Sequence, residues 1–173
     1  MNPARYFHTL RHLRPVQITG RLWHRVNLVK PDLRAAPSPR RAAGQWATSV
    51  ERPASMVAAD AFRFLNVVGQ VRNAVDWNDP AREKLWLYNL HYFDDLNAVT
   101  AAERAAWHRA LLARWVAENP PGVGNGWEPY PSSLRIVNWI KWGLAAHVLD
   151  PAWVDSLAVQ ARWLRRHVEW HLL

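Results

Sequence analysis

Apolar residues recur at helical spacing over most of the chain that follows Pro80, and this pattern predicts a mainly α fold. The apolar stretches are separated by Pro, Gly and Asn clusters, which are typical helix stops. Short connections between amphipathic helices favour antiparallel helical hairpins. We therefore expect four helices, over about residues 85–97, 101–119, 132–149 and 151–173.

Two of these helices have clear faces and ends. In the second, Trp107, Leu111, Leu112 and Trp115 share one face, and Asn119-Pro120-Pro121-Gly122 marks the end. In the fourth, Asp150 is a suitable N-cap and Pro151 suits the first helical position. A buried stripe is predicted along that helix, made of Trp153, Leu157, Trp163 or Leu164, and Trp170.

The first half of the chain is less regular. The pattern of residues 1–30 predicts short basic amphipathic helices that are broken near Pro15. These helices either lie on a membrane or on a partner, or they pack on their own domain. Residues 31–60 form a linker region rich in Pro and Ala, with little order expected from Pro31 to Pro53. Residues 62–71 predict a short β-hairpin that leads into a turn at 76–80. The remaining unit, 61–173, is read as one partial helical domain.

Composition adds charge to this picture. The 22 Lys and Arg residues exceed the 14 Asp and Glu residues, so the net charge is +8, which favours polyanionic ligands unless the Arg residues are simply solvated. There is no cysteine, so no disulfide or thiolate metal site can form. Neither a transmembrane stretch nor a secretory signal is recognisable, which gives a cytoplasmic expectation by default.

The first cluster of candidate chemistry lies within residues 89–95. Asn89, His91 and Tyr92 place amide, imidazole and phenol groups within two helical turns, which suits either a sugar site or a buried polar network. A lone His such as His91 is more often structural than catalytic.

A second cluster lies in the loop 120–131, which has three glycines and four prolines. It places Trp127, Glu128 and Tyr130 at the mouth of a helical hairpin, where aromatic faces can stack on pyranose rings. The structural alternative is that Trp127 plugs the hairpin and Tyr130 caps it.

The helix that follows carries Arg135, Asn138 and Trp139 near one face, after a cap at Ser132 or Ser133. Arg135 could fork onto an acidic sugar, or it could pair with Glu128. We expect Trp127, Tyr130, Arg135 and Asn138, opposite Asn89, His91 and Tyr92, to line one concave face. His167 and His171 have metal-compatible spacing but no convincing third ligand, so neither a metal site nor a cofactor is predicted.

Three strings resemble the N-terminal part of the heparinase II/III-like polysaccharide lyases: LWLYNLHYFDDL (85–96), WEPYPSSLRIVNWIKWGL (127–144) and ARWLRRHVEWHLL (161–173). The resemblance implies part of an incomplete α/α toroid, followed in that family by a β-sandwich. It also implies β-elimination at a uronic acid, in which the carboxylate is neutralised while Tyr or His removes the C5 proton.

The Asn and His that the family uses for this chemistry would follow Leu173, so the resemblance supplies no catalytic residue within this chain. It implies an inactive fragment whose partners are an acidic polysaccharide and the missing C-terminal half, without nucleic acid. Periplasmic location would follow if the whole enzyme is exported like those lyases. The alternative function is a basic, Trp-rich helical module that binds a partner protein, an anionic membrane or nucleic acid.

Overall fold

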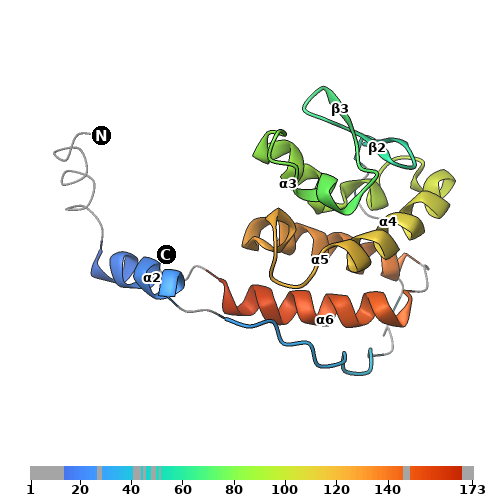
Figure 1. Cartoon of the computed structure of the whole chain (residues 1–173). Helices are drawn as coiled ribbons and strands as arrows, with labels where there is room; N and C mark the ends of the chain where they lie inside the picture. The colour runs from blue at the N-terminus through green and yellow to red at the C-terminus, as the bar shows by residue number, and fades with distance from the viewer. Residues whose placement is uncertain are drawn as a thin grey trace.

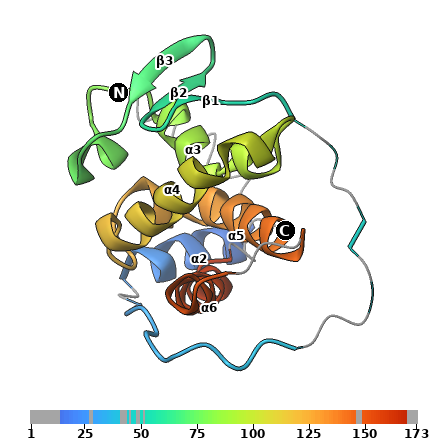
Figure 2. The same ribbon diagram turned by 90° about the vertical axis from the view of Figure 1, so that its right-hand side faces the viewer.

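The computed structural model describes residues 14–26, 29–40, 44, 46–47, 50, 52–145 and 149–168, without the side chains of residues 21 and 23–26. Helices dominate the described chain, and a small sheet lies at one end (Figure 1). The helical body is a stack in which α5 (Pro129–Leu144) lies between α6 (Pro151–Arg166) on one side and α3 (Lys84–Tyr92) on the other (Figures 1 and 2). The helix α4 (Ala105–Glu118) crosses beside them. The prediction of a mainly α fold is confirmed.

The sheet has three antiparallel strands in the order β1-β2-β3, with β1 at Met56–Ala58, β2 at Ala61–Phe64 and β3 at Val67–Gln70. The strands β2 and β3 form the predicted hairpin, and Leu65 and Asn66 at its turn have φ values of 51° and 61°. Positive φ at both central residues is the signature of a type I′ turn, which matches the strand twist. The strand β1 was not predicted and lies inside the range read as linker.

The predicted helix over 85–97 is two elements. The helix α3 spans Lys84–Tyr92, and a 3₁₀ turn, η2, spans Asp94–Asn97. The break is at Phe93, which has φ 61° and ψ 34° and ends α3 in the left-handed conformation. That conformation is unusual for an aromatic residue, and burial of the Phe93 ring, which packs against the Trp139 ring with centroids 5.4 Å apart, holds it there.

The predicted helix over 101–119 begins with a 3₁₀ turn, η3 (Ala101–Arg104), and continues as α4 (Ala105–Glu118). Its end at Asn119 agrees with the predicted stop, and the Asn119 backbone and side-chain amides both donate to the Trp115 carbonyl. Leu111, Leu112 and Trp115 are buried as the spacing predicted.

The helix α5 spans Pro129–Leu144, so it begins three residues before the predicted start. The N-cap is Glu128, and the prediction that Ser132 or Ser133 caps the helix is wrong. Pro129 and Pro131 were read as part of the preceding loop. Proline is compatible with the first helical turn because the amide groups there have no intrahelical partner.

The helix α6 spans Pro151–Arg166, and the predicted cap is present: Asp150 Oδ1 accepts the Ala152 amide at 3.2 Å. Trp153 is buried, and Leu157 and Trp163 are half-buried on the same stripe. Trp170 and His171, named in the sequence predictions, lie outside the described residues.

An aromatic core holds the helices together. The rings of Trp77 (η1, Ala74–Asn78), Trp115, Trp139 and Trp142 are all almost fully buried. Trp115 packs edge-on against Trp139 with ring centroids 5.6 Å apart, which joins α4 to α5. Such pairs add about 0.5–1.5 kcal/mol beyond the area that they bury. Most of the described tryptophans therefore serve the core.

A buried ionic cluster fastens the sheet to the helices. The Asp95 carboxylate accepts the Ser55 and Met56 backbone amides at 2.6 and 2.9 Å, and Arg104 Nε and His108 Nε2 each donate to it at 2.8 Å. Burial alone would raise the pKa of Asp95, but these hydrogen bonds lower it well below its usual range. Asp95 therefore fixes the position of β1 as an ionised group.

Residues 29–40 have neither helix nor strand, as expected for a linker, but they lie along α6 (Figure 1). The Arg162 guanidinium donates to the carbonyls of Asp32, Arg34 and Ala35 at 2.6–3.0 Å, and Asp155 accepts the Ala36 amide at 2.7 Å. The segment is therefore attached to the body. Before it, α2 (Pro15–Val26) begins at the proline predicted as a break.

Candidate functional site

The structure brings the sequence-predicted site residues together where α3, α5 and the loop between α4 and α5 meet, but several of them are buried. His91 is fully buried. Its Nδ1 accepts the Trp115 indole N–H at 3.0 Å, which requires the other nitrogen, Nε2, to carry the proton and donate to the Trp77 carbonyl at 3.0 Å. Burial and the nearby Arg135 guanidinium lower the pKa of His91 to about 3. His91 is therefore a neutral structural residue with both nitrogens engaged.

Arg135 is also fully buried, and neither sequence interpretation describes it. Its Nη1 donates to the Gly126 carbonyl at 2.7 Å and its Nε donates to Gln160 Oε1 at 2.9 Å. The guanidinium carbon lies 3.9 Å from the Trp115 ring centroid, a close cation–π contact. The predicted pair with Glu128 is absent, and a fork onto an acidic sugar is incompatible with the burial of the guanidinium.

Arg135 instead joins α5 to the 124–128 loop and to α6. Burial lowers its pKa well below the ordinary value, yet a guanidinium stays protonated in proteins. Within the described part of the chain, no carboxylate pairs with it. Neutral oxygens and an aromatic face therefore carry the whole compensation for its desolvation.

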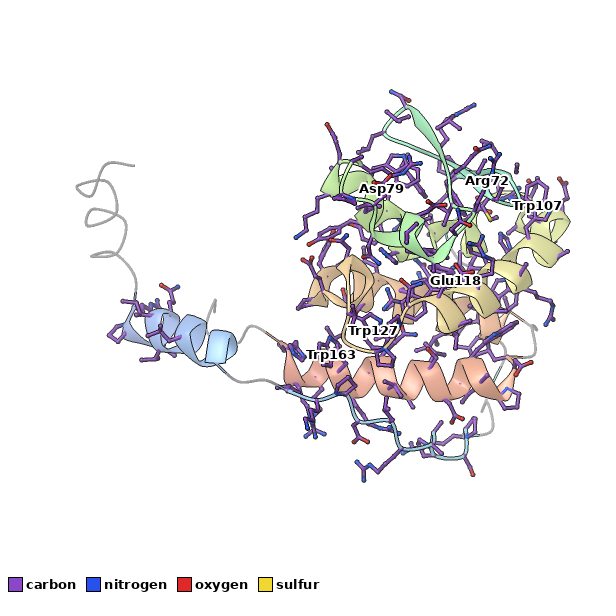
Figure 3. All side chains as sticks on the ribbon, viewed as in Figure 1. Arg72, Asp79, Trp107, Glu118, Trp127 and Trp163 are labelled. Carbon is purple, nitrogen blue, oxygen red and sulfur yellow. The ribbon has the colours of Figure 1, made fainter. Side chains whose placement is uncertain are left out.

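Trp127 and Trp139 also belong to the core. Trp127 lies in η4 (Asn125–Trp127) above α6, where its carbonyl accepts the Trp163 indole N–H at 2.8 Å (Figure 3). The two indole rings pack edge-to-face with centroids 6.1 Å apart. This is the structural alternative, in which Trp127 plugs the hairpin. Trp139 is buried against Phe93 and Trp115.

The two predicted amide residues are engaged within the fold. Asn138 Nδ2 donates to the Tyr92 carbonyl at 2.8 Å and to Asp94 Oδ1 at 2.7 Å. The other oxygen of Asp94 accepts Arg52 Nη1 at 2.8 Å. Asn89 Nδ2 donates back to the Leu85 carbonyl of its own helix at 2.7 Å. Both amide hydrogens of Asn138 are therefore used within the fold, whereas the bond of Asn89 uses one of its two.

The predicted residues Glu128, which is half-buried, and Tyr130, which is exposed, belong to a group that we call the tyrosine face. Its other members are Lys84, Tyr88 and the predicted but buried Tyr92. Lys84, Tyr88 and Tyr92 are spaced by four residues on α3, and Glu128 and Tyr130 lie at the start of α5. Tyr130 is 60% exposed, and its ring packs edge-to-face on Tyr92 with centroids 5.7 Å apart.

Charge on the tyrosine face centres on the Glu128 carboxylate. Lys84 Nζ lies 2.9 Å from Glu128 Oε1, the Tyr88 hydroxyl donates to Oε2, and Lys84 also lies 5.2 Å from the Tyr88 ring centroid. The hydrogen bond to Glu128 raises the pKa of Lys84, and burial with that same carboxylate raises the pKa of Tyr88. Burial raises the pKa of Tyr92 to about 12. All three groups are therefore protonated at neutral pH.

Lys84 and Tyr88 were not among the sequence-predicted site residues. The signal was available, because residues four apart on a helix share a face and Tyr92 had already been singled out. Spacing alone did not reveal that Glu128 would lie across from this row.

Two cavities of the described chain lie away from the tyrosine face. One of about 500 Å³ lies between the β-hairpin and the start of α3, lined by Leu65, Val67, Ala81, Arg82, Glu83 and Trp86. Another, of about 280 Å³, lies between residues 29–40, the end of α4 and α6, and Trp127 contributes to its wall. Among the described residues, no group of three or more His, Asp or Glu side chains is placed to hold a metal ion.

Comparisons of the chain with protein-family models, with curated proteins and with solved structures found no match. The tyrosine face therefore has to be interpreted from its own chemistry together with the sequence resemblance.

Proposed function

We propose that this chain is the sugar-binding helical part of a heparinase II/III-like lyase that cleaves a uronate-containing polysaccharide by β-elimination when complete. The observation that carries the binding part of the proposal is the tyrosine face. The lyase part, and the toroid that would go with it, rest on the three sequence strings that resemble that family.

The tyrosine face combines two features that an acidic sugar needs. The exposed Tyr130 ring, supported from behind by Tyr92, offers a flat apolar surface for pyranose C–H groups. Beside it, Lys84 and Tyr88 converge on a carboxylate, that of Glu128. Glu128 acts here as an internal stand-in for a uronate carboxylate, since the same donors suit either group.

The tyrosine face is suited to binding and not to proton abstraction. A tyrosine acts as a base only when it is ionised, and the raised pKa values of Tyr88 and Tyr92 keep both protonated at neutral pH. We therefore expect the chain by itself to form no unsaturated uronate product, as measured by the ultraviolet absorbance of that product.

Binding of a uronate oligosaccharide and of a neutral oligosaccharide of equal length tests the proposal by calorimetry. Tyr130→Ala should weaken uronate binding by about two- to tenfold, because a stacking aromatic contributes about 0.5–1.5 kcal/mol. The matched control is Trp46→Ala, another aromatic that is about half exposed, at 48%, but lies in the segment before the sheet. Equal losses in both variants, or none in Tyr130→Ala, would remove the tyrosine face from the function.

A second variant tests the stand-in role of Glu128. Glu128→Gln removes a negative charge from the place that the uronate would occupy, so it should strengthen uronate binding by about two- to fivefold. Binding of the neutral oligosaccharide should not change. Weaker uronate binding in Glu128→Gln would mean that Glu128 contacts the sugar through its own charge, contrary to the proposal.

A further inference from the structure

The positive charge of the chain is concentrated at one end of the sequence. Residues 1–30 contain no Asp or Glu, whereas residues 31–173 contain 16 Lys and Arg against 14 Asp and Glu. The first 30 residues therefore contribute +6 of the net +8, and the rest contributes +2. The cations of this N-terminal part are Arg5, Arg11, Arg14, Arg21, Arg25 and Lys30.

The helix α2 lies within this charged part and exposes apolar side chains. Val16, Ile18 and Leu22 are 55%, 38% and 60% exposed. Figure 1 shows α2 to one side of the stack formed by α3 to α6. Burying a leucine side chain contributes about 1.5–3 kcal/mol relative to leaving it in water. A partner that covers these side chains would therefore bind with a favourable hydrophobic contribution.

Apolar and basic positions are segregated around α2. At about 100° per residue, positions 18, 22 and 26 fall in one row and carry Ile, Leu and Val, while positions 21 and 25 border that row on the side of Ile18 and carry Arg. Gln17 and Gly20 complete the polar side. An apolar row flanked by cations, with no acidic residue, is the composition of helices that lie in a membrane interface.

We propose that α2 binds an anionic lipid surface, with its apolar row at the acyl boundary and its arginines at the headgroups. With 12 residues α2 is too short to span a bilayer, and within the described chain no helix is long and apolar enough to do so. A soluble polyanion would satisfy the arginines but leave Val16, Ile18 and Leu22 in water. An anionic membrane satisfies both sides of the helix.

The segment that follows α2 connects this helix to the helical body. Residues 29–40 follow α2 in the sequence, and Arg162 and Asp155 hold them on α6 by hydrogen bonds to their backbone. Lipid binding by α2 therefore keeps the helical body close to the membrane without requiring a lipid contact from α3 to α6. This proposal is independent of the tyrosine face.

Co-sedimentation of the full chain with vesicles tests the proposal. Wild-type protein should bind vesicles of equimolar phosphatidylcholine and phosphatidylglycerol and should bind phosphatidylcholine alone weakly. Leu22→Gln should weaken binding to the anionic vesicles by about tenfold, since it removes an apolar side chain that the bilayer would bury. Arg21→Gln should weaken it by about fivefold, since one cation near such a surface contributes about 1 kcal/mol, and should reduce its salt dependence.

Gln17→Ala is the matched control, because it changes a neutral residue on the polar side of the same helix, and its binding should equal that of the wild type. Four results would overturn the proposal. These are unchanged vesicle binding in Leu22→Gln, binding to soluble dextran sulfate but not to vesicles, a Leu22-dependent dimer in ultracentrifugation, and a lower melting temperature for Leu22→Gln. The last would mean that the apolar row packs on the chain itself.

Discussion

Replacement of Arg135 by Ala should strongly destabilise the helical body, because the guanidinium is the hydrogen-bond centre between three elements. Its two short bonds, to the Gly126 carbonyl and to Gln160 Oε1, are charge-assisted, and such bonds contribute about 1.5–3 kcal/mol each. The variant leaves Gln160 Oε1 without its donor, leaves the Gly126 carbonyl with the Ser132 hydroxyl alone, and opens a cavity beside Trp115. Against this, the cost of desolvating a buried charge disappears. We expect a net loss of about 4 kcal/mol in the free energy of unfolding.

The assay is urea unfolding followed by helical circular dichroism, with thermal unfolding in parallel. A loss of about 4 kcal/mol should lower the melting temperature by about 10 °C for a chain of this size. Arg135→Lys keeps the charge but cannot reach both acceptors with one ammonium group, so it should lie between Ala and wild type. The control is Arg63→Ala at an exposed position on β2, which should change the unfolding free energy by less than about 0.5 kcal/mol.

The result that would refute this reasoning is an Arg135→Ala protein with unchanged unfolding free energy and lost uronate binding. That combination would return Arg135 to the role of a ligand contact, which its full burial contradicts. A variant that unfolds also loses binding, whatever the role of Arg135. Uronate binding therefore has to be measured under conditions in which each variant is folded.

Three other predictions concern single residues. Asp95→Asn should cost about 3 kcal/mol of unfolding free energy at neutral pH. Because the folded pKa of Asp95 lies below the unfolded value of 3.8, its contribution is present above about pH 4 and is lost as the pH falls. The variant should therefore show a flatter acid limb in a curve of stability against pH. Gly126→Ala should cost about 1–3 kcal/mol in urea unfolding, since the added Cβ would lie 2.6 Å from His91 Nδ1. Asp150→Ala should cost about 1 kcal/mol in the same assay by removing the cap of α6.

Much of the helical architecture could be predicted because burial follows the spacing of apolar residues. The end of α4 and the cap of α6 were predictable from Asn119 and Asp150, whose side chains act locally. The break at Phe93 could not be predicted, because the left-handed conformation there is imposed by packing with distant rings and carries no glycine signal. The strand β1 was missed for a similar reason, since Asp95 fixes it from 40 residues away.

The candidate site was only partly predictable because the same residue types serve cores and sugar sites. The sequence interpretation of Arg135 was either a contact to an acidic sugar or a pair with Glu128, since charged residues are rarely buried alone. The sequence nevertheless placed it on the row that includes Pro131, Trp139 and Trp142, all of which are buried. A charged residue inside an apolar helical row therefore indicates a buried hydrogen-bond centre more strongly than a ligand contact.

The distribution of charge also separates the two proposed surfaces. On the tyrosine face Lys84 is already paired with Glu128, so this face has little net charge with which to attract a polyanion from a distance. Long-range attraction falls instead to residues 1–30, which carry +6 without any opposing charge. Added salt should therefore weaken vesicle binding steeply, because several cations act there together. Uronate binding at the tyrosine face should respond much less to salt, since it depends on Tyr130 stacking and on one short-range carboxylate contact. A steep salt response of uronate binding that persists in Tyr130→Ala but is lost in Arg21→Gln would place the polysaccharide on the N-terminal segment and not on α3 and α5.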